Sequence, residues 1–203
     1  MKKFELTTDF ITFCGIKLFK IRALIEFGNV KAGELGGYVG KEENLSQIGN
    51  AWVYGNAKVY GNAKVYGDAK VCGNAKVCGD AEVCGDAKVY DDAKVCGNAK
   101  VCGNAWVYGD AKVCGNAKVC GDAEVCGDAW LFSDDDYTTI KGFGRIFRTT
   151  TFFKEKDRIA VKCGCFYGGI DEFRKKVKET HKDSKLGKEY LKIADLMEYH
   201  FNL

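Results

Sequence analysis

The sequence predicts a mainly β repeat protein, in which a long stack of short strands lies between a small β-structure and an α+β module. Fourteen consecutive copies of one hexapeptide fill residues 49–132 of the 203-residue chain without an insertion. Residues alternate between apolar and polar inside each copy, which is typical of a strand. The flanking segments lose this period and carry longer strand and helix patterns. A fixed short period indicates a repeat architecture, whose units become stable only when stacked.

Residues 1–34 are predicted to form a β-cap. The segments KKFELTT, FITFCGIKLFKI and ALIEF alternate apolar and polar residues, and Gly15 marks the corner of a hairpin. The end of a strand stack exposes apolar groups and unpaired backbone, so a cap is expected there.

The stack itself is predicted to span residues 35–133, with an irregular beginning near Leu35. Five positions fall on inward columns when the period is stepped back from Val53 and Ala51: Leu35, Val39, Lys41, Leu45 and Gln47. Three of the five are apolar, which favours a degenerate turn before the regular run.

One unit, AKVYGN at 57–62, illustrates the repeat. Ala57 and Val59 point to one side of a short strand, whereas Lys58 and Tyr60 point to the other. The Gly-Asn pair then forms a corner, because both residue types tolerate positive φ. Each unit therefore contributes a strand and a corner, with Ala and Val inside the stack.

The run resembles the hexapeptide-repeat proteins, whose units read V-x-G-[ND]-A-x. That resemblance implies a left-handed parallel β-helix with three hexads per coil, so that residues 18 apart stack. The segment LGGYVGKEENLS is similar to the entry of phage-encoded members. The tail is similar to C-terminal modules of phage and mobile-element proteins that carry such a run. The resemblance therefore implies a phage or mobile-element origin.

Stacking collects outward side chains into columns. Lys58, Lys76, Lys94 and Lys112 share one column, and their strands lie about 4.8 Å apart, so like charges crowd. Either this column binds an anionic ligand, or it is a solvated face that opposes aggregation. Aromatic residues offer apolar area for a subunit interface. The interface candidates are Trp52, Tyr54, Tyr90, Trp106, Tyr108 and Trp130.

Eight of the eleven cysteines end a hexapeptide and also stack. In-register side chains on parallel strands point together and not at each other, which disfavours disulfides. We interpret these columns as small outward or interface residues, with a soft-metal site as the alternative. The odd number of cysteines, without a signal peptide or membrane-spanning run, favours the reducing cytoplasm of a host cell.

The tail, residues 134–203, is predicted to be a ββαα module that begins at the acidic SDDDYTT segment. Its hairpin, TTTFFKEKDRIAVKCGC, turns near Lys156 and Asp157. The apolar face of the first helix carries Ile170, Phe173 and Val177. A second helix, capped by Asp183 or Ser184, has its own apolar face. That face carries Leu186, Tyr190, Ile193, Met197 and Phe201.

Basic and hydroxyl side chains gather in GFGRIFRTTTFF and on the strand expected to pair with it. Arginine forks and hydroxyl groups suit phosphate or carboxylate recognition. The candidate ligand- or partner-binding residues are Arg145, Arg148, Thr149, Thr150, Thr151 and Lys162. The alternative is an ordinary strand with a polar edge.

Two cysteines and two histidines of the tail suggest a zinc site as a weaker interpretation. These residues are Cys163, Cys165, His181 and His200. Their C-x-C spacing departs from the usual C-x₂₋₄-C spacing, and the histidines lie far apart in the sequence. We therefore expect no metal and no cofactor.

The repeat carries no histidine between residues 35 and 132. The hexapeptide acyltransferases use a histidine base on the coil, and a related zinc hydratase class needs three coil histidines. We therefore expect a non-enzymatic, oligomeric binding protein, a trimer or dimer, that blocks or sequesters a host protein or a small anionic ligand. One form of such blocking is an anti-defence role, such as that of an anti-CRISPR protein. The alternatives are a divergent acyltransferase with His181 as its base and a polymerising rod.

The net charge of +3 is too small to indicate sequence-specific nucleic-acid binding, and no membrane partner is expected.

Overall fold

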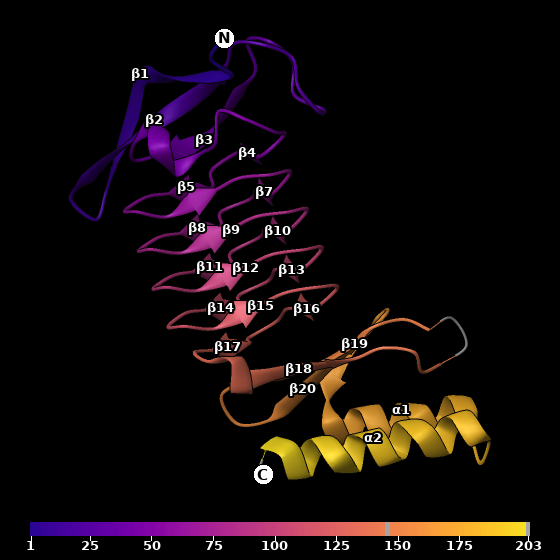
Figure 1. The fold of residues 1–203 in the computed structure, drawn as a ribbon. Helices are drawn as coiled ribbons and strands as arrows, with labels where there is room; N and C mark the ends of the chain where they lie inside the picture. The colour runs from indigo at the N-terminus through magenta and orange to yellow at the C-terminus, as the bar shows by residue number, and fades with distance from the viewer. Residues whose placement is uncertain (145–146, 202–203) are drawn as a thin grey trace.

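The computed structural model describes residues 1–144 and 147–201. A stack of parallel strands runs from an N-terminal β-hairpin at one end to a small sheet and two helices at the other (Figure 1). The chain is therefore a mainly β solenoid with a structured element at each end, as the sequence predicts. Among the described helices, none is both long and apolar enough to cross a membrane.

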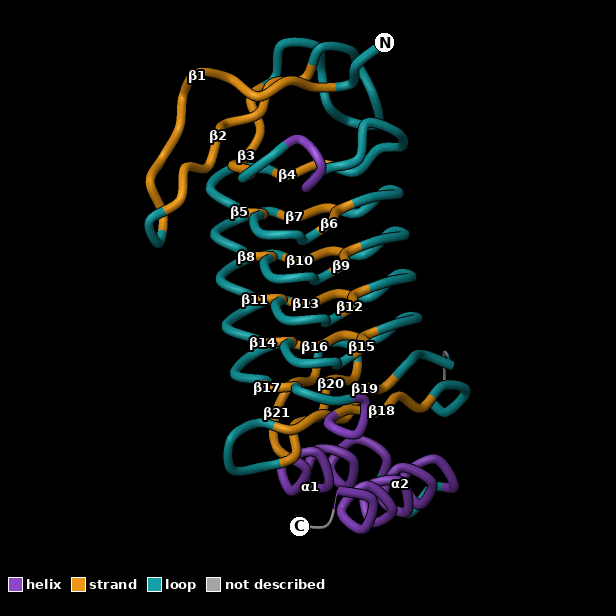
Figure 2. Tube along the Cα trace, turned by 60° about the vertical axis from the view of Figure 1, so that its left-hand side comes forward, coloured by secondary structure: helices purple, strands orange, loops and turns teal. Residues whose placement is uncertain are grey.

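The solenoid contains fourteen two-residue strands, one in each hexapeptide. These are β4 (Trp52–Val53), β5 (Lys58–Val59), β6 (Lys64–Val65), β7 (Lys70–Val71), β8 (Lys76–Val77), β9 (Glu82–Val83), β10 (Lys88–Val89), β11 (Lys94–Val95), β12 (Lys100–Val101), β13 (Trp106–Val107), β14 (Lys112–Val113), β15 (Lys118–Val119), β16 (Glu124–Val125) and β17 (Trp130–Leu131). Lys58 pairs in parallel with Lys76, and Lys76 with Lys94, so partners lie 18 residues apart. The strands form three sheets that surround one interior (Figure 2). The predicted 18-residue spacing is confirmed, whereas the left-handed winding stays a prediction.

Small and β-branched side chains fill the interior. The alanine of every unit is buried, as is the valine of the first thirteen units and Leu131 of the fourteenth, with exposed fractions of at most 1%. Successive turns hydrogen-bond along the stack; for example, the Lys58 amide donates to the Ala75 carbonyl over 2.9 Å. The corner glycines have positive φ, and a Cβ on Gly97 would lie 3.0 Å from backbone atoms of Gly115. Both constraints explain why glycine recurs at this position.

Asp91 is the one exception in the glycine column, and it also adopts a positive φ of 58°. We expect Asp91→Gly to raise the free energy of unfolding by about 0.5–1 kcal/mol, because glycine adopts this conformation without Cβ strain. Chemical denaturation followed by circular dichroism measures the change. Asp92→Gly is the matched control and should destabilise slightly, since Asp92 is not at positive φ. Equal effects of the two changes would contradict this explanation.

The N-terminal cap is a hairpin of β1 (Phe4–Phe13) and β2 (Ile16–Ala23), which continues into β3 (Leu35–Val39). Gly15 lies at its corner with a φ of 78°, as predicted. Of the ALIEF segment, predicted to be a strand, only Ala23 belongs to β2, and residues 24–27 form a loop that contributes an isolated bridge between Phe27 and Val30. This loop brings Phe27 against the end of the solenoid.

The first turn of the solenoid is offset from the regular period by two residues. Val39 pairs with Val59, and Leu45 bridges to Val65, so each partner lies 20 residues away. The inward positions predicted for Lys41, Gln47 and Leu35 are therefore wrong. The Leu35 side chain is 52% exposed, and the Gln47 amide instead holds the cap through hydrogen bonds with the Lys3 amide and the Phe4 carbonyl.

The C-terminal module begins with the 3-10 turn η2 (Asp134–Asp136), and its four strands form one antiparallel sheet. The strands are β18 (Tyr137–Ile140), β19 (Thr150–Lys154), β20 (Ile159–Cys163) and β21 (Phe166–Gly169). The predicted hairpin is confirmed as β19 and β20, and the sheet has two further strands, β18 and β21, that the sequence did not predict. β18 follows an acidic segment that resembles a linker, and β21 ends in two glycines, which are depleted in strands.

Two helices, α1 (Ile170–His181) and α2 (Lys185–Phe201), pack together against this sheet (Figure 1). Their predicted apolar faces are confirmed, with Leu186 partly buried and the other seven residues buried. The Ser184 hydroxyl accepts a hydrogen bond from the Gly187 amide over 3.2 Å, which identifies Ser184 as the cap. Arg174 joins the helices through ion pairs with Asp195 and Glu198.

The module closes the solenoid by direct packing. Phe153 and Ala160 belong to the same buried cluster as the alanine and valine columns. The Cys120 amide donates to the Tyr137 hydroxyl over 3.3 Å, and the Glu124 amide donates to the Thr151 hydroxyl over 3.0 Å. These bonds satisfy part of the open backbone of the last turn, as a solenoid end requires.

Candidate functional site

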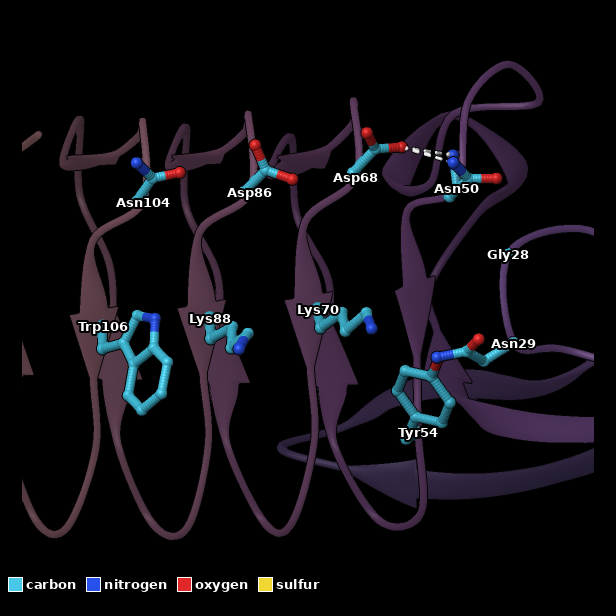
Figure 3. A pocket seen from close by; sticks show the side chains of 10 residues that line it. All are labelled: Gly28, Asn29, Asn50, Tyr54, Asp68, Lys70, Asp86, Lys88, Asn104 and Trp106. Carbon is cyan, nitrogen blue, oxygen red and sulfur yellow. Dashed lines mark hydrogen bonds between the residues drawn. The ribbon is translucent and has the colours of Figure 1, made fainter. Parts of the chain in front are cut away.

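A groove of about 530 Å³ runs along the outer face of the sheet β16–β13–β10–β7–β4. Figure 3 shows two parallel rows of side chains along it, one from the corners and one from the strands. The lining residues are Gly28, Asn29, Asn50, Tyr54, Asp68, Lys70, Asp86, Lys88, Asn104 and Trp106. The groove therefore spans four solenoid turns and ends against the cap loop.

The repeat builds this groove through its 18-residue register. The corner row is Asn50, Asp68, Asp86 and Asn104, where Asn50 donates from its side chain to Asp68 over 2.8 Å. The strand row brings Lys70, Lys88 and Trp106 into line beside it. Each side chain sits on a hydrogen-bonded strand or a glycine corner, so the spacing of both rows is fixed by the backbone.

An aromatic cluster adjoins the groove. The rings of Tyr90 and Tyr108 stack with centroids 4.9 Å apart, and Tyr90 meets Trp106 edge-on at 6.2 Å. The Lys88 ammonium lies 4.2 Å from the Trp106 ring centroid, a cation–π contact. Burial raises the pKa of Tyr90 to about 12, with Asp91 adding to the effect.

Opposite charges balance along the groove. Lys70 and Lys88 of the strand row face a corner row that contains Asp68 and Asp86. The groove thus offers both donors and acceptors, and its charge does not favour a polyanion over a polar ligand of mixed charge.

A different face carries a second lysine column. Lys58, Lys76, Lys94 and Lys112 pair in register along β5–β8–β11–β14. Burial, followed by the neighbouring Lys76 charge, lowers the pKa of Lys58. The cap hairpin covers the first part of this column, because the Phe13 ring lies 5.4 Å from the Lys58 ammonium and 5.8 Å from that of Lys76.

The six predicted interface aromatics divide into three groups. Tyr54, Tyr90, Trp106 and Tyr108 lie on the groove face, and the exposed fraction of Trp106 is 37%. Trp130 is 44% exposed, but it lies on β17 of another sheet. The prediction for Trp52 is wrong. Trp52 is fully buried under the cap, where it packs against Phe4 and Phe27.

The structure does not gather the six predicted ligand-binding residues into one site. Arg145 lies outside the described residues. Thr150 and Thr151 are buried; the Thr150 hydroxyl donates to the Cys163 sulfur over 3.2 Å, and that of Thr151 joins the module to β16. Both hydroxyls therefore make hydrogen bonds inside the protein that stabilise the fold.

The other three predicted ligand-binding residues are partly or fully exposed. Lys162 pairs across the hairpin with Thr151, as predicted, and lies 3.6 Å from Glu124. Arg148 is exposed and Thr149 is partly buried. Both line a shallow pocket of about 330 Å³ where the module meets the solenoid.

The four residues considered for zinc are also separated. Cys163, Cys165 and His181 line a second cavity, inside the C-terminal module. His200 lies at the far end of α2, beside Phe201. Within residues 1–144 and 147–201, no group of three or more His, Cys, Asp or Glu side chains is arranged to hold a metal ion.

All eleven cysteines are free thiols, but their surroundings differ. Cys14 and Cys165 are exposed, whereas Cys114 is buried with its sulfur 2.7 Å from that of Cys96. Burial, together with Cys96, raises the pKa of Cys114 to about 12. A raised thiol pKa lowers the fraction of reactive thiolate at neutral pH.

We expect iodoacetamide at pH 8 to label Cys14 and Cys165 first and Cys114 on the order of a hundredfold more slowly. The Cys114 rate should rise about tenfold per pH unit, because its thiolate fraction grows until the pH reaches its raised pKa. Peptide mass spectrometry measures each site, with urea-denatured protein as the control. Equal rates in the native protein would contradict the described burial.

The sequence predicts that lysine and tryptophan stack in one column beside the Asn/Asp corners, but it did not predict the groove between the two rows. Trp106 was the signal that could have indicated the groove. It replaces the lysine found at this hexapeptide position in most units, and it stands beside Tyr90 and Tyr108. No protein-family model matches this chain, and no curated protein matches it significantly. Its surface chemistry is therefore the basis for a functional assignment.

Proposed function

We propose that this protein is a non-enzymatic binding protein that contacts another protein through its groove face. The groove face is the outer surface of β16–β13–β10–β7–β4, and it carries Tyr54, Lys70, Lys88, Tyr90, Trp106 and Tyr108. The observation that carries the proposal is the clustering of three aromatic rings beside a groove of mixed charge. Tyrosine and tryptophan dominate the energetics of protein interfaces, because they bury much area at little entropic cost.

The balance of charge supports a protein as the partner. Lys88 and Asp86 lie on neighbouring rows, so a peptide segment that carries both charges and amide groups is matched in donors and acceptors. The 18-residue register holds these groups on a rigid backbone, which limits the entropy lost on binding.

The finer parts of the proposal rest on the family resemblance and the sequence. They are a left-handed solenoid, assembly as a homotrimer or dimer, a phage or mobile-element origin, and the blocking of a host protein in the host cytoplasm. A host-defence complex is the proposed class of target. Small anionic ligands fit the charge-balanced groove less well than a mixed-charge protein segment does.

The acyltransferase alternative gains no support from the placement of His181. The cavity that His181 lines is formed by tail residues, whereas the family resemblance requires a base on a coil beside the acyl donor. No described residue of the groove is a histidine.

The test compares Trp106→Ala with Trp130→Ala, a similarly exposed tryptophan on another face. We expect Trp106→Ala to weaken association at least tenfold while Trp130→Ala leaves it unchanged, since a central interface tryptophan is worth about 2 kcal/mol or more. Sedimentation measures self-association, and affinity capture from host lysate followed by purified binding measures a host partner. A wild-type protein that is monomeric and captures no specific partner would refute the proposal, as would equal effects of the two substitutions.

A further inference from the structure

A second cavity lies wholly within the C-terminal module, at the opposite end of the chain from the cap. It has a volume of about 420 Å³ and is lined by Gly144, Arg148, Cys163, Cys165, Phe166, Phe173, Lys176, Val177, Thr180, His181 and Tyr190. We call it the tail cavity. Its volume falls within the range of small-molecule sites, about 300–1,000 Å³.

The floor of the tail cavity is apolar and aromatic. Phe173 packs against Phe166 at 5.5 Å and against Tyr190 at 5.8 Å, measured between ring centroids. Phe173, Val177 and Tyr190 are each at most 6% exposed. These residues come from α1, α2 and the sheet, so the floor is held by the core of the module and offers a fixed surface to an apolar group.

The rim of the tail cavity is basic. Arg148, Lys176 and His181 line it, and none of its described lining residues is Asp or Glu. The Arg148 guanidinium lies against Gly164, where a Cβ would overlap it, so the absence of a side chain at Gly164 makes room for the arginine. No described carboxylate forms an ion pair with Arg148, and the pair of Lys176 with Glu179 is long, at 3.8 Å.

An apolar floor beneath an arginine that forms no ion pair with a described residue defines the chemistry of a ligand. We infer that the tail cavity binds an amphipathic carboxylate, with its aromatic or aliphatic body on Phe166, Phe173 and Val177 and its carboxylate on Arg148. The planar guanidinium can donate two parallel hydrogen bonds to a carboxylate, and a partly enclosed site strengthens such a pair. Lys176 adds a second positive charge at the rim. This inference is independent of the groove face, which shares no residue with the cavity.

Calorimetry with 4-phenylbutyrate, octanoate and the neutral 4-phenylbutyramide tests the inference. We expect saturable binding of at least one carboxylate and at least tenfold weaker binding of the amide, because the amide lacks the charge that Arg148 recognises. Arg148→Gln should weaken carboxylate binding about tenfold, and Lys176→Gln severalfold. Lys175→Gln is the matched control, since Lys175 is the exposed neighbour on α1 and does not line the cavity.

Thiol protection gives a second readout that does not depend on a variant. Cys165 is exposed and lines the cavity, whereas Cys14 is exposed on the distant cap hairpin. Saturating carboxylate should slow the alkylation of Cys165 at least fivefold and leave Cys14 unchanged. The inference is overturned if neither carboxylate saturates the protein, if the amide binds equally well, or if Arg148→Gln and Lys176→Gln both bind like Lys175→Gln. Failure here leaves the groove-face proposal untouched, because that proposal is measured with Trp106→Ala.

Discussion

Replacing Val95 by aspartate is expected to divide the solenoid into two separately unfolding parts. Val95 is fully buried in the middle of the stack, between Val77 and Val113 of the adjacent turns. A carboxyl group at this position finds no partner among alanine and valine side chains, so it costs on the order of 4 kcal/mol even when it takes up a proton. Most domains are stable by only about 5–15 kcal/mol.

The effect of Val95→Asp should also change the shape of the transition. Each solenoid turn contacts only its neighbours, and stability is a sum of turn and interface terms. Weakening a central interface should therefore replace one urea-induced transition, followed by far-UV circular dichroism, with two. Lys94→Asp is the matched control, because it places the same carboxylate on the outer face between Lys76 and Lys112. That change should leave stability equal or about 0.5 kcal/mol higher. Similar destabilisation by both changes would show that burial is not the cause.

Replacing Trp52 by alanine is expected to detach the cap from the solenoid. Trp52 is fully buried, with Phe4 at 6.1 Å and Phe27 at 5.3 Å between ring centroids. Removing a buried indole costs about 3–5 kcal/mol through lost burial and the cavity that remains. The loss falls at one joint, so residues 1–34 should become sensitive to limited proteolysis before the rest of the chain unfolds.

Two further variants separate packing at Trp52 from other effects. The Trp52 indole N–H has no hydrogen-bond partner among the described residues, so Trp52→Phe keeps an aromatic ring and removes an unsatisfied donor. Its cost should stay within about 1.5 kcal/mol. Trp106→Ala, at the same hexapeptide position but on the surface, should cost less than about 1 kcal/mol. Thermal unfolding with proteolytic mapping checks all three, and a cap that stays protected in Trp52→Ala would refute the assigned role.

The regular part of the fold could be predicted because each position of the unit has one physical task. Within the repeat, alanine and valine occupy the positions that point into the interior, and glycine occupies the corner position where φ is positive. The pattern alone therefore predicts the strands, the corners and which side of each strand points inward. The offset at Leu45 could not be predicted, because two extra residues between it and Val53 leave no mark in a segment already irregular. The pairings of Val39 with Val59 and of Leu45 with Val65 reveal it.

The candidate sites were harder to predict than the fold, since they depend on distances between columns and between elements. Trp52 and Trp106 occupy the same hexapeptide position, yet one is buried by the cap loop and the other lines a groove. Thr150 and Thr151 looked like ligand-binding hydroxyls, but the strand that carries them packs into the module and against β16. Burial by a distant segment has no local signature in such short motifs.

The three-sheet register also sets a rule for how the length of this molecule can change during evolution. Removing one complete 18-residue turn shortens the stack by about 4.8 Å. It leaves the orientation of the C-terminal module relative to the cap unchanged. Removing a single hexapeptide would instead turn the C-terminal module by a third of a revolution relative to the cap, and would send each outward column to a different sheet. Near-identical repeats recombine easily, so gains and losses in threes are the changes that preserve the groove and its orientation to the tail.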